Sequence, residues 1–232
     1  MRVLIVGGTG TIGGHAVLQL QSLGHDVSIA GRHPLPETTA LVRLPYIQGD
    51  FFEESFTKDH LSGFDAVVFA AGHDIRHVPE VENFDQHVLR VNSEAIQQFA
   101  RLARDAGVKH FVYIGSFYPH IVKDSIDSNV DVRSRKLTAD GIISLAGEEL
   151  HACVLKAPFI VEVVPGMSSP MCESYVRYSK GELGIAFFGP LGRSNFMSTQ
   201  SLSEAIAGAL VHGEPGKSYL LVDEDLSFIS YF

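Results

Sequence analysis

The sequence predicts an α/β fold in which helices cover both faces of a doubly wound parallel sheet. Residues Val3–Val6 form an unbroken apolar run, as a strand that is buried on both faces requires. Glycines follow at positions 7, 10 and 13, where the chain passes into a helical pattern of apolar residues. Short apolar runs then alternate with helical patterns along the chain, which is typical of this fold class.

Composition limits the functions that the chain can have. Its 232 residues are enough for one α/β domain with a sizeable core. The 18 Lys and Arg residues against 27 Asp and Glu give a net charge of −9, and no basic stripe is present, so nucleic-acid binding is not expected. Cys153 and Cys172 are the only cysteines, which fits a reducing compartment. No signal peptide or apolar run of membrane-spanning length is apparent, so we expect a cytoplasmic protein.

The glycines after the first strand each have a separate use. Gly7 allows a sharp turn out of the strand, Gly10 lets a ligand approach the backbone, and Gly13 lets the following helix pack closely. That helix, predicted over residues 12–23 with Gly24 as its cap, offers free N–H groups and a partial positive charge to a phosphate. A strand, such glycines and a helix in succession predict a dinucleotide-binding turn. Its expected ligand-binding residues are Gly7, Thr9, Gly10, Thr11, Ile12 and Gly13.

The spacing Gly7-x-x-Gly10-x-x-Gly13 resembles that of the short-chain dehydrogenase/reductase superfamily. The wording Gly-Gly-Thr-Gly-x-Ile-Gly is similar to its extended and atypical branches, the NAD-dependent epimerase/dehydratase and NmrA-like proteins. The resemblance implies a Rossmann sheet of order 3-2-1-4-5-6 with an additional edge strand. It also implies a single NAD(P)-binding domain over residues 1–232, with a small substrate-binding region built from insertions at about 160–200.

The second predicted strand, Val27–Ala30, bears on the choice of cofactor. NAD-specific members of this fold carry an acidic residue at this strand end, where Gly31 stands here. Arg32 follows and is able to bind a 2′-phosphate and stack on adenine, so NADP is favoured over NAD. After a loop or short helix over residues 34–45, a third strand is predicted over residues 46–50. By resemblance, Asp50 and its neighbour Phe51 lie at the adenine.

The fourth predicted strand, residues 65–72, follows a weak helix over residues 53–61. Its last residues Ala70, Ala71 and Gly72 are small enough to lie against a dinucleotide. His73 and His77 are spaced as a metal pair on a helix would be, but a loop is the simpler interpretation, so no metal is expected. The longest helical pattern covers residues 83–106. It contains Val91-Asn92, which resembles the family's Val-Asn and implies that Asn92 props the active site.

The fifth predicted strand, His110–Ser116, ends in a serine. By resemblance, Ser116 hydrogen-bonds the substrate oxygen; the alternative is a hydroxyl that caps the next turn. Residues 117–131 are expected to be irregular. Lys136-Leu137-Thr138-Ala139-Asp140 then resembles the continuation of the Tyr-x-x-x-Lys helix, which implies that Lys136 is the family lysine and holds the nicotinamide ribose.

This alignment places Val132 where the family has its catalytic tyrosine. Tyrosine and lysine one helical turn apart share a face, and the lysine charge adjusts the phenol for proton transfer. Valine cannot transfer a proton. Tyr118 and His120 lie just after Ser116, but a loop role is the favoured interpretation for both, so we expect water to supply the proton. The stretch Tyr175–Lys180 does not have the required spacing and is interpreted as pocket lining or as irrelevant.

The remaining chain supplies the end of the sheet and the substrate region. A sixth strand is predicted over residues 152–160, a Gly- and Pro-rich segment over 165–195, a helix over 202–211 and a last strand over 218–222. Ser227 begins a helical pattern that is too short to be stable alone, so the natural chain is expected to continue past residue 232.

Two functions remain open at this point. The first is an atypical NADP-dependent oxidoreductase or epimerase-like enzyme that acts on a small carbonyl or hydroxyl compound, with Ser116 and Lys136 as the catalytic residues. The second is a non-catalytic NADP-binding redox sensor or regulator of the NmrA-like type, which Val132 favours. The expected partner is a small-molecule substrate rather than a nucleic acid or a membrane, and a homodimer is left open.

Overall fold

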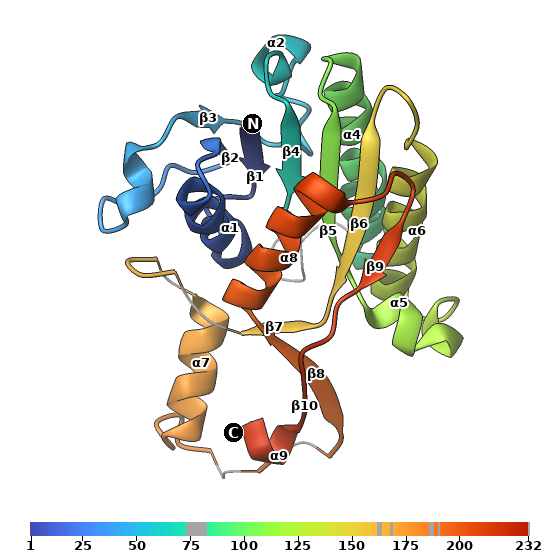
Figure 1. The fold of residues 1–232 in the computed structure, drawn as a ribbon. Helices are drawn as coiled ribbons and strands as arrows, with labels where there is room; N and C mark the ends of the chain where they lie inside the picture. The colour runs from blue at the N-terminus through green and yellow to red at the C-terminus, as the bar shows by residue number, and fades with distance from the viewer. Residues whose placement is uncertain (73–82, 162–163, 168, 186–187, 190, 232) are drawn as a thin grey trace.

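The structure is a computed structural model that describes residues 1–72, 83–161, 164–167, 169–185, 188–189 and 191–231. His73 and His77 therefore lie outside the described residues. In the described part of the chain, seven strands form a parallel sheet in the order β3-β2-β1-β4-β5-β6-β9 (Figure 1). The strands are β3 (Tyr46–Gln48), β2 (Asp26–Gly31), β1 (Arg2–Val6), β4 (Ala66–Phe69), β5 (His110–Ser116), β6 (His151–Ala157) and β9 (Ser218–Leu220). This order confirms the predicted doubly wound sheet with its additional edge strand.

Helices cover both faces of the sheet because alternate residues of each strand point to opposite sides. On β1, Val3 and Ile5 pack in the core beneath α1 (Thr11–Ser22) and α8 (Thr199–His212). Leu4 and Val6 pack in the other core. The elements on that second face are α2 (Lys58–Leu61), α3 (Phe84–Leu89), the π-helical turn η3 (Arg90–Ala95), α4 (Ile96–Asp105) and α6 (Val130–Ser144).

Three of these helical segments differ from the sequence prediction. The expected helix over 53–61 is reduced to α2, whose preceding residue Thr57 donates its backbone N–H to the His60 ring. The expected long helix over 83–106 is interrupted by the turn η3. Residues 117–131 contain α5 (Tyr118–Ile121), η4 (Lys123–Ser125) and the start of α6. Helix α6 begins at Val130 because the Asn129 side chain accepts hydrogen bonds from the first helical N–H groups.

A second, smaller sheet extends the carboxyl edge of the main sheet, where Pro158 separates β6 from β7 (Figure 1). It consists of β7 (Phe159–Val161), β8 (Arg193–Ser198) and β10 (Glu224–Ser227), with α7 (Pro170–Ser179) and α9 (Phe228–Tyr231) beside it. The one-turn helix α9 is stabilised by packing, because the Tyr231 and Phe196 rings stack with centroids 4.5 Å apart. In the part of the chain that is described, every helix is too short or too polar to cross a lipid bilayer.

Candidate functional site: a groove along the carboxyl edge of the sheet

The turn between β1 and α1 is built for close approach. Gly7 has φ of +85°, which side-chain-bearing residues rarely adopt. A Cβ atom on Gly13 would lie 2.3 Å from the Gly7 carbonyl oxygen, whereas a Cβ on Gly10 would meet that same oxygen only at 3.4 Å. Gly13 is therefore required by the fold, but Gly10 is not. Helix α1 has no side-chain cap at Gly10, so its first N–H groups face outward, as anion binding at a helix N-terminus requires.

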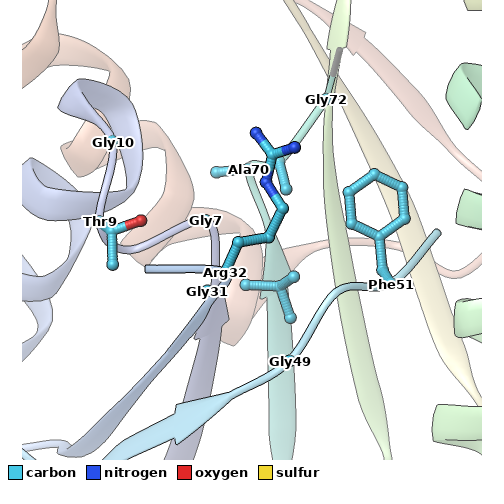
Figure 2. Close-up of a pocket in the computed structure, with 11 residues that line it drawn as sticks. Gly7, Thr9, Gly10, Gly31, Arg32, Gly49, Phe51, Ala70 and Gly72 are labelled. Atoms are coloured by element: carbon cyan, nitrogen blue, oxygen red, sulfur yellow. The ribbon is translucent and has the colours of Figure 1, made fainter. Parts of the chain in front are cut away.

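The first hollow of the groove lies between the ends of β2, β1 and β4. Its walls include the end of the first strand, the glycine turn and residues from three strand ends: Val6, Gly7, Thr9, Gly10, Gly31, Arg32, Gly49, Phe51, Ala70, Ala71 and Gly72. Figure 2 shows the Arg32 side chain reaching from the end of β2 toward Ala70 and Gly72, with the Phe51 ring at the other side of the hollow. A Cβ on Gly31 would lie 2.9 Å from the Thr9 hydroxyl, so a larger residue there requires Thr9 to move.

A second hollow, of about 490 Å³, continues the groove toward β5 and the small sheet. It shares Gly10 and the segment Ala70–Gly72 with the first hollow, so the two form one groove. Its other walls come from α1, β5, α5, α6, β6, β7 and α7. They consist of Thr11, Ile12, Ile114, Gly115, Ser116, Tyr118, Arg135, Ala157, Pro158, Phe159, Ile160, Ser169 and Cys172. Arg135 is the one Lys, Arg, Asp, Glu or His in this lining, as far as the described residues extend.

Ser116 lies at the end of β5, inside the second hollow. Its hydroxyl oxygen accepts the backbone N–H of Tyr118 at 3.2 Å. Both sequence interpretations of this serine are therefore compatible with the structure: the hydroxyl tightens the turn into α5, and it also faces the groove. The turn places the Tyr118 side chain in the groove lining as well, with its ring 5.0 Å from that of Phe117.

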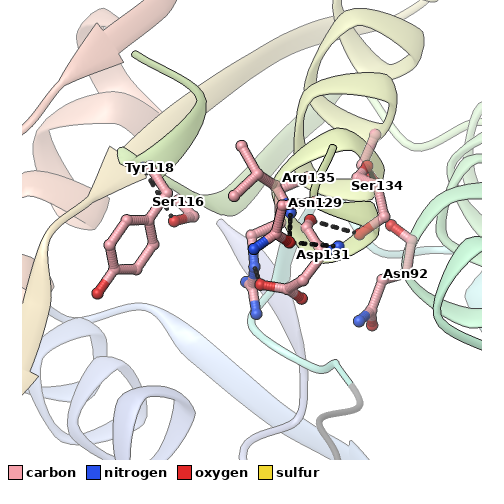
Figure 3. Close-up of polar contacts among 9 residues, drawn as sticks. Asn92, Ser116, Tyr118, Asn129, Asp131, Ser134 and Arg135 are labelled. Carbon is pink, nitrogen blue, oxygen red and sulfur yellow. Dashed lines mark hydrogen bonds and ion pairs between the residues drawn. The ribbon is translucent and has the colours of Figure 1, made fainter. Parts of the chain in front are cut away.

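Helix α6 presents Arg135 to the groove, not Lys136. The Lys136 ammonium pairs with Asp140 in solvent, and 46% of the Lys136 side chain is exposed. Arg135 is 32% exposed, and its Nε donates to the Asp131 carboxylate at 3.0 Å (Figure 3). Adjacent helical residues point about 100° apart, so only one of the two cations is able to face the groove. The expectation that Lys136 contributes to the site is not supported by this geometry. Val132, the residue aligned with the family's tyrosine, is buried, with 6% exposure.

The charge of Arg135 is stabilised by its surroundings. Burial lowers the pKa of Arg135, but the Asp131 carboxylate, through its charge and its hydrogen bond, raises that pKa above its ordinary value, and Tyr113 and Tyr118 add to the rise. The bond to Asp131 uses Nε, so within the described residues the two terminal nitrogens remain open to a ligand. The Arg135 guanidinium, held in place by Asp131, thus presents a fixed cationic group to the groove.

Asn92 lies in the π-helical turn behind the groove and is 5% exposed. Its backbone carbonyl accepts a hydrogen bond from the buried Thr138 hydroxyl of α6, and a Cβ on Gly72 would lie 3.5 Å from its side-chain oxygen. Asn92 therefore connects the end of β4 to the helix that carries Arg135. Such π-helical turns often mark functional sites.

The structure brings most of the predicted residues together. Gly7, Thr9, Gly10, Arg32, Phe51 and Ala70–Gly72 line the first hollow, and Thr11, Ile12 and Ser116 line the second. Gly13, Asp50, Asn92 and Lys136 are not among the lining residues. The Asp50 carboxylate instead accepts the backbone N–H of Phe52 within its own turn.

Sequence reasoning missed Arg135 and gave Tyr118 no chemical role. The available signal for Arg135 was the spacing Asp131-x-x-x-Arg135, which places two opposite charges on one helical face. This pair lies one residue before Val132 and Lys136, the positions that were aligned with the family's tyrosine and lysine. Tyr175 packs its ring near those of Phe159 and Tyr231, and the Tyr178 hydroxyl contacts the backbone of Phe188. The described residues contain no group of three His, Cys, Asp or Glu side chains that would hold a metal ion.

Comparisons with known proteins agree with this architecture. A 3-beta-hydroxysteroid dehydrogenase from Mycolicibacterium neoaurum is 31% identical over a match that spans 50% of this chain and 32% of that protein. A UDP-glucose 4-epimerase from Klebsiella pneumoniae is 30% identical over 50% of this chain and 89% of that protein. The match to the first relative thus spans about a third of its length.

Among solved structures, a dTDP-glucose 4,6-dehydratase double mutant from Streptomyces venezuelae with NAD bound superposes with a TM-score of 0.77 at 20% identity. The match covers 100% of this chain and 79% of that chain. It confirms the Rossmann-like fold. The family model of the NAD dependent epimerase/dehydratase family matches residues 3–136, which is more than half of the chain. The chain therefore belongs to the NAD dependent epimerase/dehydratase family.

Proposed function

We propose that the protein is an NADP-dependent oxidoreductase or epimerase-like enzyme that acts on a small carbonyl or hydroxyl compound. The observation that carries this proposal is the continuity of the groove: the glycine turn and Ser116 line the same hollow. A dinucleotide bound across the carboxyl ends of parallel strands would therefore bring its reactive end to a strand-end hydroxyl.

The residues of the first hollow fit a phosphorylated adenosine. The uncapped N-terminus of α1 offers N–H groups to the pyrophosphate, and Gly10 leaves room for it. Arg32 stands where a 2′-phosphate would need a cation, and Gly31 carries no acid that would repel this group. NADP is accordingly favoured over NAD. When bound, the nicotinamide ring would accept or supply a hydride.

The residues of the second hollow have separate roles in this proposal. Ser116 hydrogen-bonds the substrate oxygen, and Arg135 supplies a fixed positive charge near it, which replaces the role expected of Lys136. Phe159 and Ile160 form an apolar wall. Because the cofactor would take up part of the 490 Å³, the substrate is expected to be small.

The non-catalytic sensor remains the second candidate, and one observation favours it. Helix α6 carries no phenol on its groove side, since Asp131 and Arg135 occupy that face and Val132 is buried. A protein without a placed proton donor would bind the cofactor but would catalyse the reaction about 10²- to 10⁴-fold more slowly.

The test uses the purified chain with NADPH and a panel of benzaldehyde, cyclohexanone, acetaldehyde and pyruvate, with loss of NADPH absorbance as the measurement. The proposal expects turnover of at least one carbonyl compound and a loss of turnover in Ser116→Ala. A matched variant is Ser128→Ala, at an exposed serine outside the groove lining. Tight NADPH binding without reduction of any panel member would favour the sensor.

A further inference from the structure

The proposed reaction needs a proton donor, and only a few side chains that line the groove carry a proton that they could donate. Within the second hollow as described, the side chains that carry a transferable proton are Thr11, Ser116, Tyr118, Arg135, Ser169 and Cys172. An arginine does not deprotonate in proteins, and aliphatic hydroxyls are very weak acids. Tyr113 is buried behind the groove, where burial raises its pKa, and it is not part of the lining. Tyr118 and Cys172 therefore remain.

The position of Tyr118 distinguishes it from Cys172. Tyr118 lies two residues after Ser116, and its backbone N–H is bound to the Ser116 hydroxyl at 3.2 Å. The serine and the phenol are thus parts of one fixed turn. Cys172 comes from a separate element, α7. Figure 3 shows Ser116 between the Tyr118 ring and the Asp131–Arg135 pair.

From this geometry we infer that Tyr118 donates the proton to the substrate oxygen that Ser116 orients, in place of a tyrosine on α6. The inference rests on the proposed function. In the direction of reduction, a bound reduced nicotinamide would supply the hydride that the carbonyl carbon accepts, and the electron pair of the C=O bond would move onto oxygen. That oxygen takes the phenol proton and becomes a hydroxyl group, and water then reprotonates the phenolate. Oxidation of the alcohol follows the same steps in reverse.

The electrostatics of the groove support this role. Arg135 and Tyr118 line the same hollow, and the interaction with Tyr118 is among the effects that raise the pKa of Arg135. Tyr118 is also 40% exposed, so water has access for reprotonation. His120, on the same turn, is exposed and does not line the groove.

The experiment compares Tyr118→Phe with His120→Gln and Cys172→Ala in the full chain. Phenylalanine keeps the ring that contacts Phe117 and removes only the hydroxyl. With NADPH and whichever member of the carbonyl panel the wild type reduces, kcat of Tyr118→Phe should fall about 10²- to 10⁴-fold, the contribution of a placed general acid. KM and the NADPH dissociation constant from fluorescence titration should remain within about twofold, because the change removes no binding group from the cofactor site. His120→Gln should match the wild type.

Each alternative outcome has a distinct meaning. Retention of wild-type kcat in Tyr118→Phe, or loss of kcat only in Cys172→Ala, would overturn the inference. Weaker NADPH binding or a lower Tm in Tyr118→Phe, in proportion to the lost activity, would reduce Tyr118 to a structural role and would likewise overturn it. A wild type that binds NADPH but reduces no panel member refutes the proposed enzyme itself, and Tyr118 then has no proton to deliver.

Discussion

Gly10 and Gly13 lie three residues apart on the same turn, but we predict different effects of alanine at the two positions. Gly13→Ala should lower the stability of the fold, whereas Gly10→Ala should weaken NADPH binding. A Cβ on Gly13 would lie 2.3 Å from the Gly7 carbonyl oxygen and 2.7 Å from the Gly8 Cα. Both atoms belong to the backbone, so α1 would have to move away from β1. Overpacking of this kind costs about 1–3 kcal/mol or more. In a domain of this size each kcal/mol lowers Tm by about 2–4 °C, so Tm of Gly13→Ala should fall by roughly 2–12 °C.

At Gly10 the protein has room for the same atom. Among the described residues beyond its own chain neighbours, a Cβ on Gly10 would meet one atom within 4 Å, the Gly7 carbonyl oxygen at 3.4 Å. The backbone has φ −100° and ψ 172°, which alanine adopts freely. Alanine is a poorer N-cap than glycine, which costs at most about 1 kcal/mol. The new methyl group would, however, occupy space at the uncapped helix N-terminus. If it displaces one charge-assisted hydrogen bond to a phosphate, NADPH affinity should fall by about 1.5–3 kcal/mol, or roughly 10- to 150-fold.

Two measurements on each variant separate these effects: Tm from thermal unfolding without cofactor, and the NADPH dissociation constant from fluorescence titration. The expected pattern is a folded Gly10→Ala that binds weakly and a destabilised Gly13→Ala. Wild-type NADPH affinity in Gly10→Ala would show that the cofactor does not pass this turn, and a wild-type Tm in Gly13→Ala would refute the steric argument.

Three further predictions follow from other parts of the structure. Arg32→Gln should weaken NADPH binding by about 1–3 kcal/mol, the value of a charged hydrogen bond, and should leave NADH binding unchanged; parallel titrations of the two cofactors check this, and an equal loss for both would contradict it. Arg135→Gln should lower kcat/KM for the reduced carbonyl about 10- to 150-fold through loss of one charge-assisted bond, whereas the neighbouring exposed Lys136→Gln should have no effect, and the reverse pattern would restore the sequence-based assignment. Burial raises the pKa of the Cys153 thiol to about 11. Because the thiol titrates at a lower pH in the unfolded chain, the folded protein holds this proton more tightly. The resulting contribution to the free energy of unfolding, on the order of 3 kcal/mol, should be present below about pH 8.5 and lost as the pH rises to about 11. Urea unfolding at several pH values should show this loss in the wild type beyond that of Cys153→Val, and parallel curves would refute it.

The fold and most of the cofactor groove were predictable because they depend on local signals. Val3–Val6 and the glycines 7, 10 and 13 are contiguous, and each carries its own physical reason. The place of Arg32 in the groove lining was predictable because this residue directly follows a strand end. Its contact with a 2′-phosphate stays a prediction. These inferences did not require knowledge of how distant segments pack.

The rotation of α6 was less predictable because it depends on contacts between distant segments, which the sequence does not display. The sequence alone does not show whether Arg135 or Lys136 is the cation on the groove side of the helix. The rotation is fixed by the Asn129 cap and by the Thr138 hydroxyl, which contacts a carbonyl 46 residues earlier in the chain. A shift of one residue on a helix turns a side chain by about 100°, which is enough to exchange a buried role for an exposed one.

The aromatic group of the small sheet, Phe159, Phe196, Phe228 and Tyr231, has a consequence for how this protein could diversify. Its rings contact one another and belong to neither of the two cores of the main sheet. The outer wall of the groove therefore has its own source of stability. On the inner side, Met197 of β8 and Ile160 of β7 join the core beneath α1 and α8. Substitutions on the outer side of the small sheet would therefore be carried mainly by the ring contacts, and the glycine turn and the main sheet would be left unchanged.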